Sequence, residues 1–497
     1  MNATFNDSTG RLALLTDLYQ LTMAYAHWKT GSYRKEAVFH LYFRNNPFGG
    51  GFTVACGLAR AKEFLSNFRF ASEDLDYLRT LGGQDGNPLF DEGFLEYLRE
   101  LRLECDIDAV DEGRIVFPST PLVRVRGPII AAQLVETPLL NIVNFETLIA
   151  TKAARIAIAA RGEPVMEFGL RRAQGIDGAL AASRAAYIGG CGATSNVLAG
   201  KLFGIPVRGT HSHSWVMAFS SEVESFERYA EASPGNCVFL VDTFHSLDGV
   251  AHAIEVGRKL KRAGYALGGI RLDSGDLAYL SIEARRMLDE SGFKDAAIVA
   301  SNELDENIIG SLREQGARVS VWGVGTRLIT GHDQSAMGCV YKLSAVRDPG
   351  GPWRARMKLS EQAAKVSNPG IQQVRRFSSG IEFAGDMIWH DDKESGEHPS
   401  FLMIDPLDMT RRRAFAPNQA FEDLLKPIFR KGELVSPPEP LESVRARVVE
   451  DLSKFHPGIK RFVNPHIYPV GLEESLFKMR SDLMLRLRNL RADGLFD

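Results

Sequence analysis

The middle of the chain, from residue 164 to residue 345, alternates between short apolar runs and longer stretches with helical spacing of their apolar residues. The apolar runs lie at 164–168, 205–208, 238–241, 267–272, 297–300 and 319–322. The helical stretches lie at 176–187, 196–203, 249–263, 277–289 and 305–315. This order predicts parallel strands joined by right-handed crossovers. Such strands favour an irregular α/β barrel, with an open doubly wound sheet as the alternative.

The two ends of the chain follow other patterns. Residues 16–25 predict a helix capped by Thr16 or Asp17, and residues 37–44 predict a strand followed by a glycine turn and a second strand. The pattern further predicts helices within 60–105, 129–161 and 441–455 and a pair of short strands within 114–126. After residue 345 the alternation stops, and residues 346–400 are rich in Gly, Pro, Lys and Arg.

Composition narrows the class of protein. Of the 497 residues, 44% are hydrophobic and 24% are charged, and the net charge of −3 argues against a protein that coats nucleic acid or an anionic membrane. The most apolar stretch, 128–150, is interrupted by Glu136, Pro138 and Glu146 and does not predict a membrane span. The cysteines are scattered, the N-terminus has no basic signal region, and we expect a reducing, cytoplasmic location.

A cluster of polar residues follows each predicted strand of the central region. The clusters are EFGLR (167–171), GTHSH (209–213), DTFH (242–245), RLDSGD (271–276), SNE (301–303) and GVGT (323–326). Because the carboxyl ends of parallel strands meet on one rim, and ligands bind there, we expect these clusters to form a site.

Two histidines in one extended segment are the first candidates for chemistry. His211 and His213 are two residues apart, which places them on one face, although a lone histidine is more often structural. Zinc ligation is the alternative, but no thiolate follows at ligand spacing. Asp242, after the next strand, can orient a histidine ring or can simply cap the following helix.

Other rim residues suit an anionic ligand. Strand alternation sends Arg271 and Asp273 to one side, where the first can hold an anion and the second can hold Mg²⁺ or sugar hydroxyls. Gly325 and Thr326 suggest a phosphate nest, or merely a tight turn. Phe168, followed by Arg171, places an aromatic face near a guanidinium, with helix packing as the alternative for Phe168.

The order of these motifs resembles that of the nicotinate phosphoribosyltransferases, which are type II phosphoribosyltransferases. The resemblance extends over nearly the whole chain and is carried by TDLYQ (16–20), EFGLRR (167–172), GTHSHSW (209–215), VDTFHS (241–246), IRLDSGDL (270–277), GVGT (323–326), GCVYKL (338–343) and NPHIYPV (464–470).

The resemblance implies an irregular barrel over residues 146–345 and an α+β domain built from 1–145 and 346–497. It implies transfer of phosphoribosyl from 5-phosphoribosyl-1-pyrophosphate to nicotinate in NAD salvage, coupled to ATP hydrolysis and dependent on Mg²⁺. It also implies a homodimer whose active sites are completed across the interface.

Roles for single residues follow from the matching motifs. His213 resembles the histidine that ATP phosphorylates, and Asp242 resembles the carboxylate that orients it. Phe168 and Tyr19 resemble the two faces of a sandwich around the pyridine ring, with Tyr19 supplied by the partner subunit. The remaining matches are Thr210 and Arg271 near the nicotinate carboxylate, Arg171, Gly325 and Thr326 at phosphate, and Asp273 at ribose or Mg²⁺.

One position bears on the choice of pyridine. The related nicotinamide enzymes carry Asp where this chain has Asn196. A carboxylate there would repel the carboxylate of nicotinate by a few kcal/mol at an effective dielectric constant of about 20, so Asn196 favours nicotinate. A nicotinamide enzyme and a nucleotide-binding sensor without catalysis are the alternatives, and the intact set of rim residues argues against the sensor.

Overall fold

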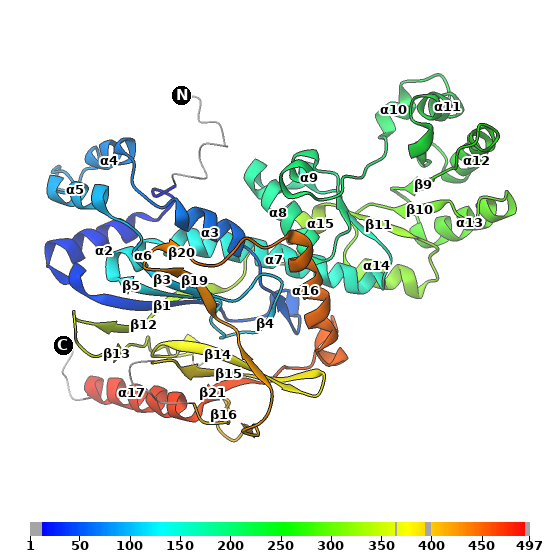
Figure 1. Ribbon diagram of the computed structural model, residues 1–497. Helices are drawn as coiled ribbons and strands as arrows, with labels where there is room; N and C mark the ends of the chain where they lie inside the picture. Colours follow the sequence, from blue (N-terminus) through cyan, green and yellow to red (C-terminus); the bar gives the residue numbers. More distant parts are fainter. Residues whose placement is uncertain (1–11, 363–364, 393–398, 493–497) are drawn as a thin grey trace. The chain divides into compact units, whose positions relative to one another are not determined.

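A six-stranded parallel sheet forms the centre of residues 148–335 in the computed structural model, which describes residues 12–362, 365–392 and 399–492 (Figure 1). The strand order is β7-β6-β11-β10-β9-β8, and every pair is parallel. The strands are β6 (Val165–Glu167), β7 (Ala193–Thr194), β8 (Val238–Leu240), β9 (Gly269–Leu272), β10 (Ala297–Ala300) and β11 (Val321–Val324).

Helices follow the strands of this sheet, as the crossover rule requires. They are α8 (Gly175–Gly189), α9 (Val197–Phe203), α10 (His213–Met217), α11 (Glu222–Ala232), α12 (Ser246–Arg262), α13 (Leu277–Glu290), α14 (Glu306–Glu314) and α15 (Thr326–Ile329), with the short turns η3 (Leu170–Arg172) and η4 (Pro234–Asn236). Helix α12 shows why they pack: its apolar residues Val250, Ala253 and Leu260 are buried, while its lysines face outward.

The end strands β7 and β8 are bridged by an irregular segment rather than by direct pairing. The predicted strand at 205–208 forms only an isolated parallel bridge, between Val207 and Thr194, because Pro206 has no N–H for a ladder. At the other end of this segment, the Nε2 of His211 accepts a hydrogen bond of 3.3 Å from the backbone N–H of Leu240 in β8. The barrel is therefore an irregular one, as predicted.

The described residues within 1–147 and 336–497 form a second compact unit. It contains a seven-stranded sheet of order β13-β12-β1-β5-β3-β19-β20, a six-stranded sheet of order β17-β16-β21-β15-β14-β18, and the pair β2-β4. The strands from the first part of the chain are β1 (Glu36–Phe43), β2 (Thr53–Val54), β3 (Asp106–Ala109), β4 (Ile115–Val116) and β5 (Val123–Pro128). Both parts of the chain contribute to the first sheet, because β1 pairs with β5 on one side and with β12 on the other.

The remaining strands come from the second part of the chain. They are β12 (Cys339–Arg347), β13 (Arg354–Ala355), β14 (Gln372–Ser379), β15 (Glu382–His390), β16 (Leu402–Ile404), β17 (Arg412–Ala414), β18 (Phe421–Asp423), β19 (Lys426–Arg430), β20 (Glu433–Leu434) and β21 (Val470–Glu473). The barrel segment was predicted to extend to residue 345. In the structure, β12 belongs to the second unit instead, because this strand pairs with β1, and the first unit ends at residue 335.

Helices cover the sheets of this unit. They are α2 (Leu18–Lys29), α3 (Leu58–Ser66), α4 (Ser72–Arg79), α5 (Glu92–Glu100), α6 (Ile129–Leu134), α7 (Glu136–Ala160, which continues past residue 147), α16 (Leu441–Ser453) and α17 (Glu474–Ala492), with the turns η1 (Ser32–Arg34), η2 (Pro47–Gly49) and η6 (Pro457–Lys460). Figure 1 shows α17 along the sheet that contains β15, β16 and β21, and residue contacts join the helix to all three strands.

A buried ion pair ties the two parts of the chain together in this unit. Arg376 of β14 has no exposed surface and donates from Nε and Nη2 to the two carboxylate oxygens of Asp386 in β15, at 2.8 and 2.7 Å. Its Nη2 also donates to the backbone oxygen of Ile115, 2.7 Å away in β4. The bidentate geometry is the strong form of a charged hydrogen bond and fixes β14 and β15 against an N-terminal strand.

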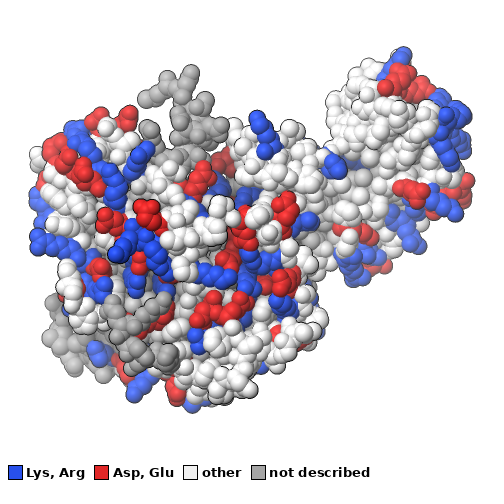
Figure 2. Space-filling view, in the orientation of Figure 1, with Lys and Arg blue, Asp and Glu red and all other residues white. Residues whose placement is uncertain are grey.

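Positive and negative side chains are mixed on the face of the molecule that Figure 2 shows. On the face shown in Figure 2, lysines and arginines are interspersed with aspartates and glutamates, in keeping with the net charge of −3. Among the helices of the described residues, none is both long and apolar enough to cross a membrane.

Candidate functional site

Arg271, in β9, is the centre of a connected group of polar side chains at the carboxyl ends of the parallel strands. Its Nη2 donates to Asp273 Oδ1 at 2.9 Å, and its Nη1 donates to Thr210 Oγ1 at 3.2 Å. Its Nε donates to Ser301 Oγ at 2.8 Å, and Ser301 donates to Asp273 Oδ1. The ends of β9 and β10 and the segment that follows the bridge at Val207 therefore meet on one guanidinium, which brings Thr210, Arg271 and Asp273 together.

Asp273 is held in its ionised form. Burial alone would raise the pKa of this carboxyl, but the hydrogen bond from Ser301 and the charge of Arg271 outweigh burial and keep the pKa below its ordinary value. The group therefore presents an anion at neutral pH beside a guanidinium that is always protonated.

Phe168 presents an aromatic ring to the same guanidinium. Its ring centroid lies 6.0 Å from Cζ of Arg271. Gly323 in β11 makes room for the ring, since a Cβ there would approach the ring carbons of Phe168 to 2.8 Å. An aromatic face beside a guanidinium suits a flat, anionic ligand.

Asp242 joins the loop after β8 to the loop after β9. Its Oδ2 accepts hydrogen bonds from the backbone N–H of Asp273 at 2.8 Å and from the hydroxyl of Ser274 at 2.6 Å. Its Oδ1 is buried and has no hydrogen-bond partner among the described residues. A buried, unsatisfied carboxylate oxygen next to an ionised carboxylate is a donor set that fits Mg²⁺, which takes one or two carboxylates together with waters or phosphates.

His213 is the first residue of α10, and 40% of its side chain is exposed. Its Nδ1 lies 3.1 Å from Thr243 Oγ1, and its Nε2 lies 3.8 Å from Asp273 Oδ2. Among the contacts of the described residues, it is Thr243, not Asp242, that meets the ring. The orienting role implied for Asp242 stays a prediction, and Thr243 is the residue that the sequence did not single out.

His211 has a structural position. It is buried against the rings of Phe226, Tyr229 and Phe239, and burial lowers the pKa of its imidazole to about 4. Its neutral ring accepts from Leu240, as described above.

The side chain of Asn196 is buried and makes its hydrogen bonds within the protein. Only 2% of the residue is exposed. Its Oδ1 accepts from the backbone N–H of Ala199 and so caps α9, while its Nδ2 donates to the hydroxyl of Ser183 at 3.2 Å. The capping signal, an Asn immediately before a helix, was present in the sequence. The effect of Asn196 on the choice of pyridine stays a prediction.

The predicted phosphate binders lie around the start of α15. Gly325 precedes this short helix, and Thr326 is its first residue. The hydroxyl of Thr326 donates to Glu303 Oε1 at 3.1 Å. A phosphate group that accepts a hydrogen bond from this hydroxyl would therefore have to displace the carboxylate of Glu303. Arg171 lies in η3, is exposed, and follows Phe168 by three residues.

Tyr19 belongs to the other unit, on α2, where 48% of it is exposed. Leu15, Leu18 and Met23 nearby are exposed to 43%, 52% and 40%. Gln20, the next residue, is fully buried, so Tyr19 occupies the outward face of the helix.

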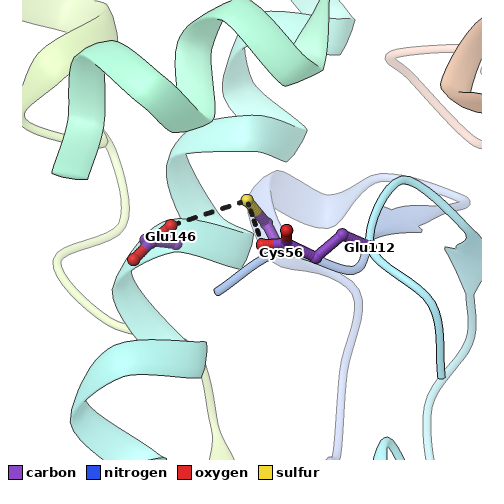
Figure 3. Close-up of side chains that lie close together, drawn as sticks. All are labelled: Cys56, Glu112 and Glu146. Carbon is purple, nitrogen blue, oxygen red and sulfur yellow. Dashed lines mark hydrogen bonds between the residues drawn. The ribbon is translucent and has the colours of Figure 1, made fainter. Parts of the chain in front are cut away.

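A further group of potential metal ligands lies in the same unit as Tyr19. Figure 3 shows Cys56 between Glu112 and Glu146, with Sγ 3.7 and 3.8 Å from their carboxylate oxygens. The backbone N–H of Gly57 also donates to Glu112 at 2.7 Å, and Arg60 lies 3.5 Å from Glu146. These contacts form a buried polar network that holds the start of α3 against α7.

The chain matches one protein family in three consecutive parts. Residues 14–144 match the N-terminal domain of nicotinate phosphoribosyltransferase, residues 164–350 match the nicotinate phosphoribosyltransferase family, and residues 371–480 match the C-terminal domain. The chain belongs to the nicotinate phosphoribosyltransferase family.

Individual members of the nicotinate phosphoribosyltransferase family are similar to this chain over almost their whole length. The chain is 44% identical to nicotinate phosphoribosyltransferase of Bacillus subtilis, over 97% of this chain and 96% of that protein. It is 38% identical to nicotinate phosphoribosyltransferase 2 of Arabidopsis thaliana, over 93% and 92% of the two chains. The crystal structure of human nicotinic acid phosphoribosyltransferase superposes with a TM-score of 0.82 at 33% identity and covers 94% of this chain and 99% of that one.

Proposed function

We propose that this chain transfers the phosphoribosyl group of 5-phosphoribosyl-1-pyrophosphate to nicotinate, yielding nicotinate mononucleotide and pyrophosphate in NAD salvage. The observation that carries the proposal is the arrangement of Arg271 beside the ring of Phe168, within a chain of this family. A planar aromatic carboxylate matches both groups, since it can stack on the ring and pair with the guanidinium.

Nicotinate would bind with its carboxylate toward Arg271 and Thr210 and with its ring on Phe168. The pyridine nitrogen is the nucleophile, and its lone pair forms the bond to the anomeric carbon while the bond to pyrophosphate breaks. The nitrogen carries no proton to remove, so the step needs no general base. Positive charge on the sugar in the transition state would be favoured by the anionic Asp273.

The remaining rim residues would hold the phosphates and the metal. Asp242 and Asp273 are the residues that would hold Mg²⁺, which when bound neutralises charge on the leaving pyrophosphate. Gly325, Thr326 and Arg171 would bind phosphate by backbone N–H groups, hydroxyl and guanidinium, with the Thr326 hydroxyl exchanging Glu303 for the phosphate.

Coupling to ATP is proposed to use a phosphohistidine at His213. Its ring is partly exposed, and the Thr243 hydroxyl lies at Nδ1, which leaves Nε2 as the nitrogen to accept the γ-phosphoryl group. The new phosphate would change the charge next to Asp273, 3.8 Å away, and so alter the binding of phosphoribosyl pyrophosphate.

The family also suggests a homodimer in which Tyr19 of one subunit covers the pyridine bound to the other. The exposed apolar residues that surround Tyr19 on its helix support a contact with a second copy, because such a patch is costly to leave in water.

The test measures pyrophosphate release from phosphoribosyl pyrophosphate and Mg²⁺, with nicotinate or nicotinamide and with or without ATP. We expect release with nicotinate and stimulation by ATP. A His213→Ala variant should keep the basal rate but lose the stimulation and the acid-labile phosphate on the protein. Release only with nicotinamide would contradict the substrate assignment, and full stimulation of the variant would contradict the phosphohistidine.

A further inference from the structure

Ser301 lies where the register of two parallel strands places it directly against the site. In the pairing of β10 with β9, Val299 is opposite Arg271 and Ala300 is opposite Leu272. The next residue along, Ser301, therefore lies opposite Asp273, just beyond the last paired residues. It is 4% exposed, and its Cβ lies 3.4 Å from the position that a Cβ on Gly323 would occupy.

The bonds of Ser301 form a closed ring with Arg271 and Asp273. Arg271 Nε donates to Ser301 Oγ at 2.8 Å, Ser301 donates to Asp273 Oδ1, and Arg271 Nη2 donates to the same oxygen at 2.9 Å. The direction of each bond is fixed, because a guanidinium can only donate and an ionised carboxylate can only accept. The hydroxyl has a single proton, and its contact with Asp273 is shorter than its other possible bond, to the backbone oxygen of Leu272 at 3.4 Å.

This ring occupies one edge of the guanidinium, the edge formed by Nε and Nη2. Nη1 donates one N–H to Thr210 at 3.2 Å. Each terminal nitrogen, Nη1 and Nη2, keeps one further N–H with no partner among the described residues. A carboxylate binds a guanidinium most strongly through two parallel N–H bonds, and the terminal nitrogens are the pair that remains for such a ligand.

We propose that Ser301 is a positioning residue for nicotinate, which acts by keeping Asp273 from taking the Nε–Nη2 edge of Arg271 for itself. Without the hydroxyl, Asp273 can close onto both nitrogens as a bidentate ion pair, because its two oxygens match that edge. The guanidinium would then turn toward Asp273, and Asp273 Oδ2 would leave its place 3.8 Å from His213 Nε2. This inference rests on the proposed contact between Arg271 and the nicotinate carboxylate.

The test compares Ser301→Ala with Ser301→Thr and with a matched control. Ser281→Ala removes another buried hydroxyl in the same unit, in α13, one that donates to Ala278 O and accepts from the backbone N–H of Arg318 rather than bonding to Arg271 or Asp273. Steady-state rates with varied nicotinate and varied phosphoribosyl pyrophosphate give KM and kcat for each variant, and thermal unfolding gives their stability.

We expect Ser301→Ala to raise KM for nicotinate about tenfold, the usual effect of one lost charged hydrogen bond, with a smaller change in KM for phosphoribosyl pyrophosphate. Ser301→Thr should restore most of the loss, and Ser281→Ala should lower the unfolding temperature without changing either KM. Equal effects of Ser301→Ala and Ser281→Ala on KM, or no rescue by Thr, would overturn the proposal.

An Arg271→Lys variant separates this inference from the function on which it rests. Lysine keeps the charge but loses the two-pronged geometry. If Arg271→Lys leaves KM for nicotinate unchanged, the proposed contact between Arg271 and the nicotinate carboxylate is wrong, and so is the positioning role of Ser301. If Arg271→Lys raises that KM and Ser301→Ala does not, the proposed contact stands and the role of Ser301 is wrong.

Discussion

At the scale of the residue, Gly323 decides where the ring of Phe168 can lie. A Cβ at this position would meet the ring at 2.8 Å, which forces the ring to move. We expect Gly323→Ala to raise KM for nicotinate by about tenfold or more, since base stacking on an aromatic residue contributes roughly 1–3 kcal/mol in comparable sites. The matched control is Gly310→Ala in α14, where a Cβ meets nothing within 4 Å. That variant should bind nicotinate normally and be slightly more stable.

The buried ring of His211 should make the stability of the folded protein depend on pH. Burial lowers the pKa of its ring in the folded protein from 6.5 to about 4, so the unfolded chain takes up the proton first as the pH falls. Stability should therefore decrease between about pH 6.5 and pH 4, by up to roughly 3 kcal/mol, and should be unaffected by this group above pH 6.5.

The measurement is urea unfolding at several pH values, for the wild-type protein and for His211→Gln. Glutamine keeps an acceptor for the backbone N–H of Leu240 but does not titrate, so the stability of the variant should depend less on pH over this interval. An identical dependence in both proteins would show that His211 does not couple to folding.

At the scale of the element, the β14–β15 hairpin depends on the pair between Arg376 and Asp386. Both side chains are fully buried, and removing Asp386 takes away the bidentate pair and leaves the buried Arg376 charge with the weaker contact to Asp451, 3.7 Å away. We expect Asp386→Ala to lower the free energy of unfolding by roughly 3–5 kcal/mol, as is usual for breaking a buried pair. Asp408→Ala, which removes the exposed partner of Arg411, should change the denaturant midpoint little, and equal effects would contradict the prediction.

At the scale of the whole molecule, the apolar face around Tyr19 predicts self-association. Leu18 is 52% exposed on α2, and a carboxylate there would be buried on association at a high cost. We expect Leu18→Glu to shift the mass measured by light scattering from dimer toward monomer and to reduce turnover in parallel. The control is Ile381→Glu. Ile381 is 87% exposed in the turn between β14 and β15, and its replacement should change neither the measured mass nor the turnover. A wild-type protein that is monomeric at all concentrations would remove the basis of this prediction.

The sequence did not predict the β14–β15 hairpin, the two-residue β7, or the contacts of Ser301 and Thr243. The hairpin lies in a region rich in Gly, Pro and charged residues, and its buried Arg376 and Asp386 look like surface residues until the partner is known. Strand β7 is too short to produce a periodic pattern. Thr243 carries no signal of its own in the sequence, because a carboxylate such as that of its neighbour Asp242 is the commoner partner of a histidine ring.

The sequence by itself determined that residues 164–345 contain parallel strands with helices between them, and that the polar clusters lie at the carboxyl ends of those strands. These conclusions depend on periodicity and strand polarity, which are local properties of the chain. Only the tertiary structure decided which side chains of the clusters meet. Ser301 reaches Arg271 through the register of β9 and β10, and that register is fixed by packing between residues 30 positions apart in the chain rather than by any local pattern.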